Sequence, residues 1–299
     1  MDLINKNIMK LVILTATYNH PENLKDLYTS LKEQKAKSFL WVIINDGSKP
    51  ETEDAIKRFQ EENLLNIKYV YQENAGKSAA INRGLDVTCD SDYVLIVDDD
   101  EVLNNDATLI VEDYYARFKG KCTCMNFNRS DYNGIPLTNG QELKDRLMSF
   151  QKHKSLKLHA DGYVGYYTDA IKNVRFPLVK GEKYMGPSVL MMLASANSTI
   201  LWAKAVLGKT EYLEGGITKQ GRKLRLRNPI GMIYHASLMM HPDSSFRVKY
   251  GYSVYAFAYK YYADVREESL KQYGIDMNVF YPVKPLGKLL ALYWKRKFV

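Results

Sequence analysis

The first hundred residues alternate between short apolar runs and stretches in which apolar residues recur every three or four positions. The runs cover residues 11–17, 39–44, 67–71 and 93–97, and the helical stretches cover 21–31, 50–64 and 79–85. Uninterrupted apolar runs are typical of parallel strands that are covered on both faces. Strands and helices that alternate in this way imply right-handed crossovers. The pattern therefore predicts a layered α/β sheet, mostly parallel, with helices on both faces.

Polar side chains follow each of these predicted strands. They are Thr17, Tyr18 and Asn19 after the first strand, Asp46 and Ser48 after the second, Gly76 to Ser78 after the third, and Asp98, Asp99, Asp100 and Glu101 after the fourth. Ligands of open parallel sheets bind in the crevice at the carboxyl ends of the strands. We therefore expect these four segments to converge there.

The acidic run that ends the fourth predicted strand needs an explanation of its own. Two carboxylates about 4 Å apart repel by roughly 4 kcal/mol at an effective dielectric near 20. Mg²⁺ binds through one or two carboxylates and takes its other ligands from water and substrate phosphates, so a divalent cation would relieve this repulsion. The alternative from these residues alone is an acidic loop whose side chains extend into water.

After residue 109 the alternation of apolar runs and helical spacing becomes irregular. Residues 141–158 are predicted to be helical and basic, residues 189–193 to begin a buried helix, and residues 245–268 to form one long helix with a tyrosine stripe that packs inside the protein. Residues 285–299 are predicted to form a basic amphipathic tail. Such a helix can lie on an anionic membrane. It can equally dock on the protein with its basic face in water, and the sequence leaves both readings open.

Composition and charge restrict the class of protein. Hydrophobic residues make up 46% of the 299 residues and charged residues 25%, which is ordinary for a soluble globular chain. The net charge of +8 favours anionic partners without choosing among them. Three cysteines, Cys89, Cys122 and Cys124, favour reduced thiols in the cytosol. The N-terminus has no apolar segment typical of a secretory signal, and no stretch is apolar enough to suggest a spanning helix.

The motifs together resemble those of the bacterial family 2 glycosyltransferases of exopolysaccharide or capsule synthesis, which have the GT-A fold. The resemblance covers residues 11–109. It rests on the segments 15–19, 45–48 and 74–84, and on Asp98-Asp99-Asp100 in the place of the family's Asp-x-Asp signature. Each motif is weak alone, but the four occur in the family's order, each at the end of a predicted strand.

The resemblance implies a role for each motif residue. Thr17, Tyr18 and Asn19 would hold the nucleotide, and Asp46 would accept a hydrogen bond from the imide of a uracil. Lys77, just before a helix, would meet the diphosphate together with the amides of the helix N-terminus. Asp98 and Asp99 would hold the ribose and the sugar phosphate. Asp100 would bind Mn²⁺ or Mg²⁺, although the sequence leaves open which of the three aspartates contact the metal.

The catalytic base is less clearly marked. Family 2 enzymes are typically inverting and often carry a Glu-Asp pair after the acceptor region, but no such dipeptide occurs between residues 176 and 193. Gly181-Glu182-Lys183-Tyr184 stands there, similar to a variant found in exopolysaccharide enzymes. We predict Glu182 as the base, with Asp169 and Asp161 in reserve. His235 and His241 occupy positions where some GT-A enzymes place a late metal ligand, but a structural role is favoured for both.

The resemblance also implies a division of the chain and a set of partners. Residues 1–110 would bind the nucleotide sugar, residues 111–215 the acceptor within the same GT-A domain, and residues 216–299 would form a helical C-terminal extension. The expected substrates are a nucleotide-sugar donor, with UDP the favoured nucleotide, and a glycan or lipid-linked acceptor. We expect no nucleic-acid partner. The expected location is the cytoplasm, with peripheral contact to the inner face of an anionic membrane.

Other functions remain to be separated from this one. A sugar-1-phosphate nucleotidyltransferase would need a glycine-rich loop bearing Arg and Lys after the first strand, where this chain has Thr17-Tyr18-Asn19-His20-Pro21. A non-catalytic nucleotide-sugar-binding module would not need all four motifs. A basic nucleic-acid-binding protein would concentrate its positive charge in one stripe, whereas here Lys and Arg are scattered. Processive membrane synthases of the family carry a Gln-x-x-Arg-Trp motif, which this sequence lacks.

Overall fold

The structure, a computed structural model, describes residues 9–138, 140–159, 161–210 and 217–298, with the side chains of 217–220 left aside. Within these ranges one nine-stranded sheet has the order β3-β2-β1-β4-β8-β6-β9-β5, and β7 pairs with β9. The strands are β1 (Leu11–Thr17), β2 (Phe39–Asp46), β3 (Asn66–Gln72), β4 (Tyr93–Ile96), β5 (Glu101–Leu103), β6 (Cys124–Ser130), β7 (Arg146–Met148), β8 (Tyr163–Tyr167) and β9 (Ile200–Thr210).

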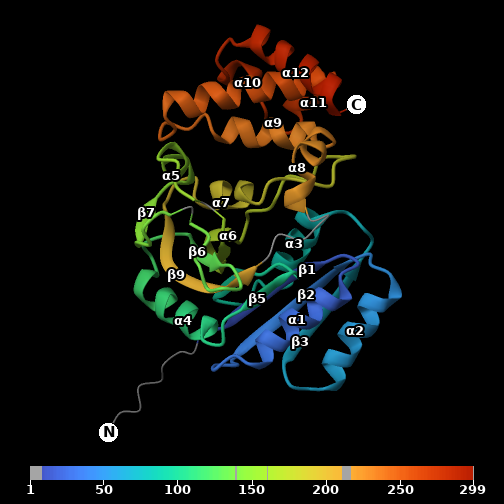
Figure 1. Cartoon of the computed structure of the whole chain (residues 1–299), viewed down its shortest axis with the longest axis vertical. Coiled ribbons are helices and arrows are strands. Elements are labelled where there is room, and N and C mark those ends of the chain that lie inside the picture. Colours follow the sequence, from blue (N-terminus) through green and yellow to red (C-terminus); the bar gives the residue numbers. More distant parts are fainter. Residues whose placement is uncertain (1–8, 139, 160, 211–216, 299) are drawn as a thin grey trace.

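The helices surround this sheet and continue beyond it (Figure 1). They are α1 (Pro21–Lys32), α2 (Pro50–Glu61), α3 (Lys77–Asp86), α4 (Ala107–Phe118), α5 (Phe150–Ser155), α6 (Thr168–Ile171), α7 (Ser188–Ala194), α8 (Ile217–Leu226), α9 (Pro229–Leu238), α10 (Phe246–Tyr262), α11 (Glu267–Lys271) and α12 (Lys284–Phe298), with a 3₁₀ turn at Met277–Val279. The N-terminal segment examined for a signal, Val299 and the predicted boundary at 215/216 lie outside the described residues.

The predicted layered α/β sheet is confirmed, with its first four strands parallel. β1 pairs in parallel with β2 and β4, and β2 with β3. Successive residues of β1 face opposite sides, as the period of two requires: Leu11 and Ile13 pack with α1 and α2, whereas Val12 and Leu14 pack with α3 and α7. β8 then joins β4 in antiparallel orientation and begins the mixed half of the sheet. Helices therefore cover both faces.

Two predicted elements of the second half were wrong in extent or type. Residues 141–158 do not form one helix: β7 pairs with β9, and Ser149 then caps the short helix α5 by accepting a hydrogen bond from the N–H of Lys152. Phe150 and Trp202 are buried, so tertiary packing overrides the local helical pattern. The predicted long helix of residues 245–268 ends at Tyr262, because Asp264 adopts a left-handed conformation with φ of 49°.

The C-terminal helices build a core of their own, at the opposite end of the molecule from α2 and β3 (Figure 1). In α12, Gly287, Ala291 and Trp294 are buried. A Cβ at Gly287 would lie 2.3 Å from the Cβ of Phe257, so α10 and α12 approach each other closely. The seam between them is filled by Trp294, whose ring lies 4.9 Å from that of Tyr259. The division of the chain into three functional parts stays a prediction.

Candidate functional site

Hydrogen bonds join all four strand-end segments at one rim of the sheet. Thr17 Oγ1 donates to Asp99 at 2.7 Å, and the N–H of Asn19 donates to Ser48 Oγ at 2.9 Å. Asp46 accepts hydrogen bonds from the segment before α3, and Lys77 at the start of α3 forms an ion pair with Asp98. The predicted convergence is therefore confirmed, and it follows from the parallel order of β3, β2, β1 and β4.

The loop after β1 is held in a fixed shape by its neighbours. Asn19 has φ of 59°, a left-handed conformation that Asn tolerates better than most residues, and its side chain accepts the N–H of Lys49 at 2.8 Å. Tyr18 lies between Thr17 and Asn19, which are both held by hydrogen bonds, and is itself 47% exposed. His20 lies beside the aspartates, its Nδ1 3.2 Å from Asp99. The hydrogen bond with Asp99 raises the pKa of His20. Sequence reasoning assigned His20 no more than a place before a helix.

Asp46 is buried and surrounded by donors. Its carboxylate accepts from Gln72 Nε2 at 2.7 Å, Asn74 Nδ2 at 3.2 Å and the N–H groups of Ala75 and Gly76, both at 2.9 Å. A carboxylate offers about four acceptor positions, so these donors fill it. In this structure Asp46 holds the loop before α3. Its predicted contact with a uracil requires one of these donors to leave.

The three aspartates lie in the turn between β4 and β5, and each has a different environment. Lys77 and Asp98 are both about one-third exposed. Burial lowers the pKa of Lys77, but the charge of Asp98 raises it, and the net effect is a rise. Asp99 is held by Thr17 and His20. Asp100 forms no ion pair within the described ranges, and its pKa is raised by burial and by the charges of Asp98 and Asp99. A cation beside Asp100 would relieve that repulsion.

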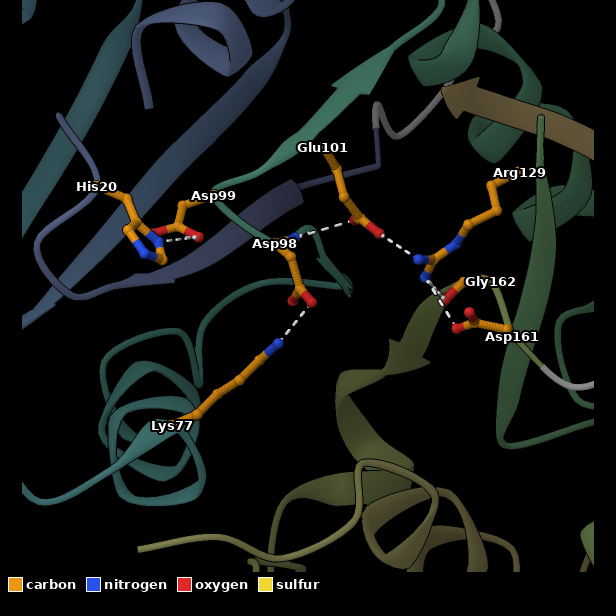
Figure 2. A network of polar contacts seen from close by, with 8 residues as sticks. All are labelled: His20, Lys77, Asp98, Asp99, Glu101, Arg129, Asp161 and Gly162. Atoms are coloured by element: carbon orange, nitrogen blue, oxygen red, sulfur yellow. Dashed lines mark hydrogen bonds and ion pairs between the residues drawn. The ribbon is translucent and has the colours of Figure 1, made fainter. Parts of the chain in front are cut away.

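A buried ion-pair network continues from this turn into the other half of the sheet (Figure 2). Glu101 accepts the N–H of Asp98 at 3.0 Å and pairs with Arg129 at 2.9 Å. Arg129 in turn donates to the carbonyl of Gly162 at 2.9 Å and lies 3.3 Å from Asp161. Burial raises the pKa of Glu101 against the opposing effect of Arg129. No sequence signal singled out Arg129, because its partners lie at least 28 residues away.

Glu182, the predicted base, binds the N-terminus of α9. Its two oxygens accept the N–H groups of Ile230 at 2.7 Å and Gly231 at 2.8 Å. A carboxylate is favourable there because the free N–H groups and the helix dipole attract negative charge. Burial raises the pKa of Glu182 and these two hydrogen bonds lower it, with a net rise. The role of Glu182 as a base stays a prediction, and it would compete with this capping contact.

The loop that carries Glu182 also covers the segment before α3. A Cβ at Gly76 would lie 2.3 Å from the carbonyl oxygen of Lys183, and Gly76 has φ of 94°, so only glycine suits this position. Lys183 Nζ donates to the carbonyl of Asn74 at 3.2 Å. Sequence reasoning named Lys183 only as a neighbour of Glu182. The structure brings its positive charge to the loop that Asp46 holds.

The reserve bases lie at different edges of the sheet. β8 runs antiparallel to β4 with Val164 opposite Ile96 and Tyr167 opposite Tyr93. Asp161, just before β8, therefore lies at the rim of the sheet that carries Asp98, Asp99 and Asp100, here called the aspartate rim. The ion pair between Asp161 and Arg129 agrees with that position. Asp169, after β8, is exposed near the opposite edge, where the N–H of Thr168 donates to the carbonyl of Asp92.

The residues present suit a cation that takes few protein ligands. In the described part of the chain, no three His, Cys, Asp or Glu side chains are grouped as a metal site. His235 contacts Ser188 Oγ at 3.3 Å, and burial lowers its pKa to about 4, which fits a neutral structural histidine. Asp100, with Asp98 and Asp99 beside it, offers the oxygen donors that Mg²⁺ or Mn²⁺ prefers, provided that diphosphate and water complete the coordination.

Curated relatives match about a third of the chain. The poly-beta-1,6-N-acetyl-D-glucosamine synthase of Staphylococcus aureus (strain COL) is 34% identical over 97 residues, which cover 32% of this chain and 23% of that protein. Glycosyltransferase GlyA of Streptococcus pneumoniae serotype 4 is 35% identical over 97 residues, covering 32% of this chain and 14% of that protein. The match thus spans less than a quarter of the length of either relative.

Solved structures match most of the chain at low sequence identity. Staphylococcus aureus TarS 1-349 in complex with UDP-GlcNAc gives a TM-score of 0.60 at 17% identity, over 89% of this chain and 78% of that one. The mannosyltransferase PcManGT from Pyrobaculum calidifontis, in complex with GDP-Man and Mn²⁺, gives a TM-score of 0.60 at 14% identity, over 95% of this chain and 84% of that one. These similarities establish the GT-A fold.

Across the described ranges, none of the helices combines the length and the apolar character that crossing a bilayer requires. The family model described as "Glycosyl transferase family 2" matches residues 12–175, which is more than half of the 299 residues and includes all four motifs at the rim. This chain belongs to glycosyl transferase family 2.

Proposed function

We propose that this glycosyltransferase moves a sugar from a UDP-sugar to a glycan or lipid-linked acceptor in the synthesis of a cell-surface polysaccharide. The observation that carries the proposal is the joining of the four motif segments by hydrogen bonds and the Lys77–Asp98 ion pair at one rim. UDP is favoured as the nucleotide because the family resemblance assigns Asp46 to a uracil. GDP, the nucleotide bound to PcManGT, is the alternative.

The donor diphosphate would lie at the N-terminus of α3. Lys77 and the free N–H groups of the first helical turn offer positive charge to it. Binding of the diphosphate would compete with Asp98 for Lys77, which would leave Asp98 available to the sugar or ribose hydroxyls. Asp99 would remain fixed by Thr17 and His20 while it accepts a hydrogen bond from the donor.

Asp100 is the proposed metal ligand, with Asp98 or Asp99 as a second. Bound there, Mn²⁺ or Mg²⁺ would neutralise the negative charge that builds on the departing nucleoside diphosphate. The support is the position of Asp100 in one turn with Asp98 and Asp99, between β4 and β5. Burial and the charges of these two neighbours raise the pKa of Asp100, so a nearby cation would favour its carboxylate.

We propose an inverting displacement with one carboxylate as the base for the acceptor hydroxyl. Glu182 remains a candidate, but its two oxygens would have to leave the N-terminus of α9. Asp161 is 45% exposed at the aspartate rim and lies 3.3 Å from Arg129 Nη2. These observations favour Asp161 over Glu182 as the base, and over Asp169 at the other edge.

The exposed face of α12 supports peripheral contact with an anionic membrane. Leu286, Leu289 and Tyr293, at spacings of three and four, are 42%, 63% and 51% exposed. The sequence from residue 277 to 299 contains no Asp or Glu and carries Lys284, Lys288, Lys295, Arg296 and Lys297. A docked helix with a second apolar stripe among basic residues fits the surface of an anionic leaflet.

A panel of UDP- and GDP-sugars tests the proposed donor. We expect UDP release from at least one UDP-sugar, dependent on Mn²⁺ or Mg²⁺, and calorimetric binding of UDP that strengthens with metal. A nucleotidyltransferase would instead consume a nucleoside triphosphate with a sugar 1-phosphate. A non-catalytic module would bind UDP without releasing it from any UDP-sugar, and either result would contradict the proposal.

A further inference from the structure

The guanidinium of Arg129 is a buried junction between the two halves of the sheet. Its side chain is 12% exposed and that of its partner Glu101 is 3% exposed. The Nη1 atom lies 2.9 Å from Glu101, whereas Nη2 serves both the carbonyl of Gly162 at 2.9 Å and Asp161 at 3.3 Å. In Figure 2 the network runs without interruption from Lys77 through Asp98, Glu101 and Arg129 to Asp161.

The strands bring these residues together across β9. Arg129 on β6 lies opposite Gly208 of β9, and Glu101 on β5 lies opposite Thr210. A Cβ at Gly208 would come within 2.2 Å of the carbonyl oxygen of Val102 and 2.5 Å of the Tyr163 hydroxyl. The guanidinium also lies 5.4 Å from the centre of the Tyr163 ring. Arg129 is therefore fixed in place by packing as well as by charge.

Glu101 connects Arg129 to the turn between β4 and β5 that carries Asp98, Asp99 and Asp100, here called the aspartate turn. Its second oxygen accepts the N–H of Asp98, the first residue of the turn. Asp98, Asp99 and Asp100 carry like charges, so their mutual repulsion favours an open turn. Burying the Glu101 carboxyl is costly without a partner of opposite charge, and the Arg129 guanidinium 2.9 Å away supplies one.

We infer that Arg129 is a positioning residue of the donor site: through Glu101 it holds the aspartate turn, and with the other edge of the same guanidinium it holds the segment that carries Asp161. The inference rests on the proposed function, because it assigns the aspartate turn to a nucleotide diphosphate. A two-edged guanidinium suits this task since it bonds two groups in one plane, which a lysine ammonium does not.

Four variants test whether the Arg129–Glu101 ion pair positions the donor site or only stabilises the fold. Arg129→Lys keeps the charge but loses the planar fork. Arg129→Met and Glu101→Gln each break the pair from one side, and the double variant removes both charges together. Arg117→Lys is the matched control, because Arg117 also pairs with two carboxylates, Asp113 and Asp145, but on the outer helix α4. Circular dichroism and thermal melting establish that each variant is folded before binding is measured.

The readouts are UDP affinity by calorimetry, with and without Mn²⁺, and kcat and KM for UDP release from the UDP-sugar that the panel identifies. We expect Arg129→Lys to weaken metal-dependent UDP binding at least tenfold while it stays folded, and Arg117→Lys to bind as the wild type does. If Glu101 and Arg129 act as one unit, the double variant loses no more affinity than the worse of the two single variants.

The outcomes distinguish this inference from the proposed function. Wild-type UDP affinity and kcat in a folded Arg129→Lys protein would overturn the inference alone, as would a melting temperature that falls without any change in binding. Additive losses in the double variant would show that Glu101 and Arg129 act independently, which also contradicts it. A wild type that neither binds UDP nor releases it from any UDP-sugar would overturn the proposed function, and the inference with it.

Discussion

The aspartate rim and the C-terminal helices stabilise their side chains by opposite means. At the rim, Asp46, Asp99 and Glu101 are buried polar groups, each held by specific donors at hydrogen-bonding distance. In the seam between α10 and α12, Trp294 and Phe257 are held mainly by apolar packing, and the guanidinium of Arg222 lies 4.6 Å from the Trp294 ring. Removing one partner of a buried polar group costs folding free energy, because the other partner is left without a hydrogen bond. A hydrophobic core tolerates substitutions that conserve side-chain volume. Because the rim also carries the four motif segments, substitutions there should alter function, whereas those in the helices should change mainly stability or association.

The largest effect expected from this contrast is at Asp100. Asp100→Ala removes the proposed metal ligand and should lower metal-dependent UDP release by about 10²–10³-fold, the usual cost of losing one electrostatic contact to the departing charge. The melting temperature should not fall, because the repulsion in the turn is relieved. Unchanged turnover of Asp100→Ala in the presence of a chelator would remove the metal from the mechanism.

The next effect is expected at Asp161. Asp161→Asn should lower kcat for UDP release by about 10²-fold, within the range for loss of a positioned base, and leave UDP affinity unchanged. Asp169→Asn is the control at the opposite edge of the sheet, and it should behave as the wild type does. Equal kcat values for the two variants would exclude Asp161 as the base.

A smaller effect, on stability, is expected at Glu182, where the rim meets the helices. Glu182→Gln weakens the contact with the N-terminus of α9 and should lower the free energy of unfolding by about 1 kcal/mol, as measured by denaturant titration. Loss of kcat by a factor of 10² or more with unchanged stability would instead identify Glu182 as the base.

The smallest effect is expected on the outer face of α12. Leu289→Glu should reduce binding to vesicles of phosphatidylglycerol and phosphatidylcholine several-fold in a sedimentation assay, with UDP release unchanged. Leu64→Glu is the control, because Leu64 is 57% exposed between α2 and β3. Wild-type binding that is equal for anionic and purely phosphatidylcholine vesicles, or insensitive to salt, would contradict the proposed membrane contact.

The sequence predicted the rim well because its signals are local. A parallel strand and the polar residues after it are continuous in the chain, so the convergence of Thr17, Asp46, Lys77 and Asp98 follows from the sequence pattern alone. The contacts of Glu182 with α9 and of Arg129 with Glu101 and Asp161 join segments that are distant in the chain. Residues 141–158 were mistaken for a helix because the pairing of β7 with β9 depends on that same distant information.

The amphipathic tail is a second case in which the outcome depends on contacts between distant segments. The predicted tail of residues 285–299 has an apolar group at helical spacing, Leu286, Leu289, Leu290, Tyr293 and Trp294, and the sequence left docking and membrane contact as alternatives. In the structure the group is divided: Trp294 is buried against α10, whereas Leu289 and Tyr293 are exposed. Periodicity defines an apolar arc, but only the position of α10 determines which part of that arc is covered.

The location of Trp294 gives the protein an intrinsic optical reporter. The three tryptophans of the chain stand in separate places: Trp41 in β2, Trp202 in β9 and Trp294 in the α10–α12 seam. Replacing Trp41 and Trp202 by phenylalanine would leave a single emitter whose spectrum responds to release of α12 from its seat. Detachment of the tail could then be followed by fluorescence in real time, without attaching a dye.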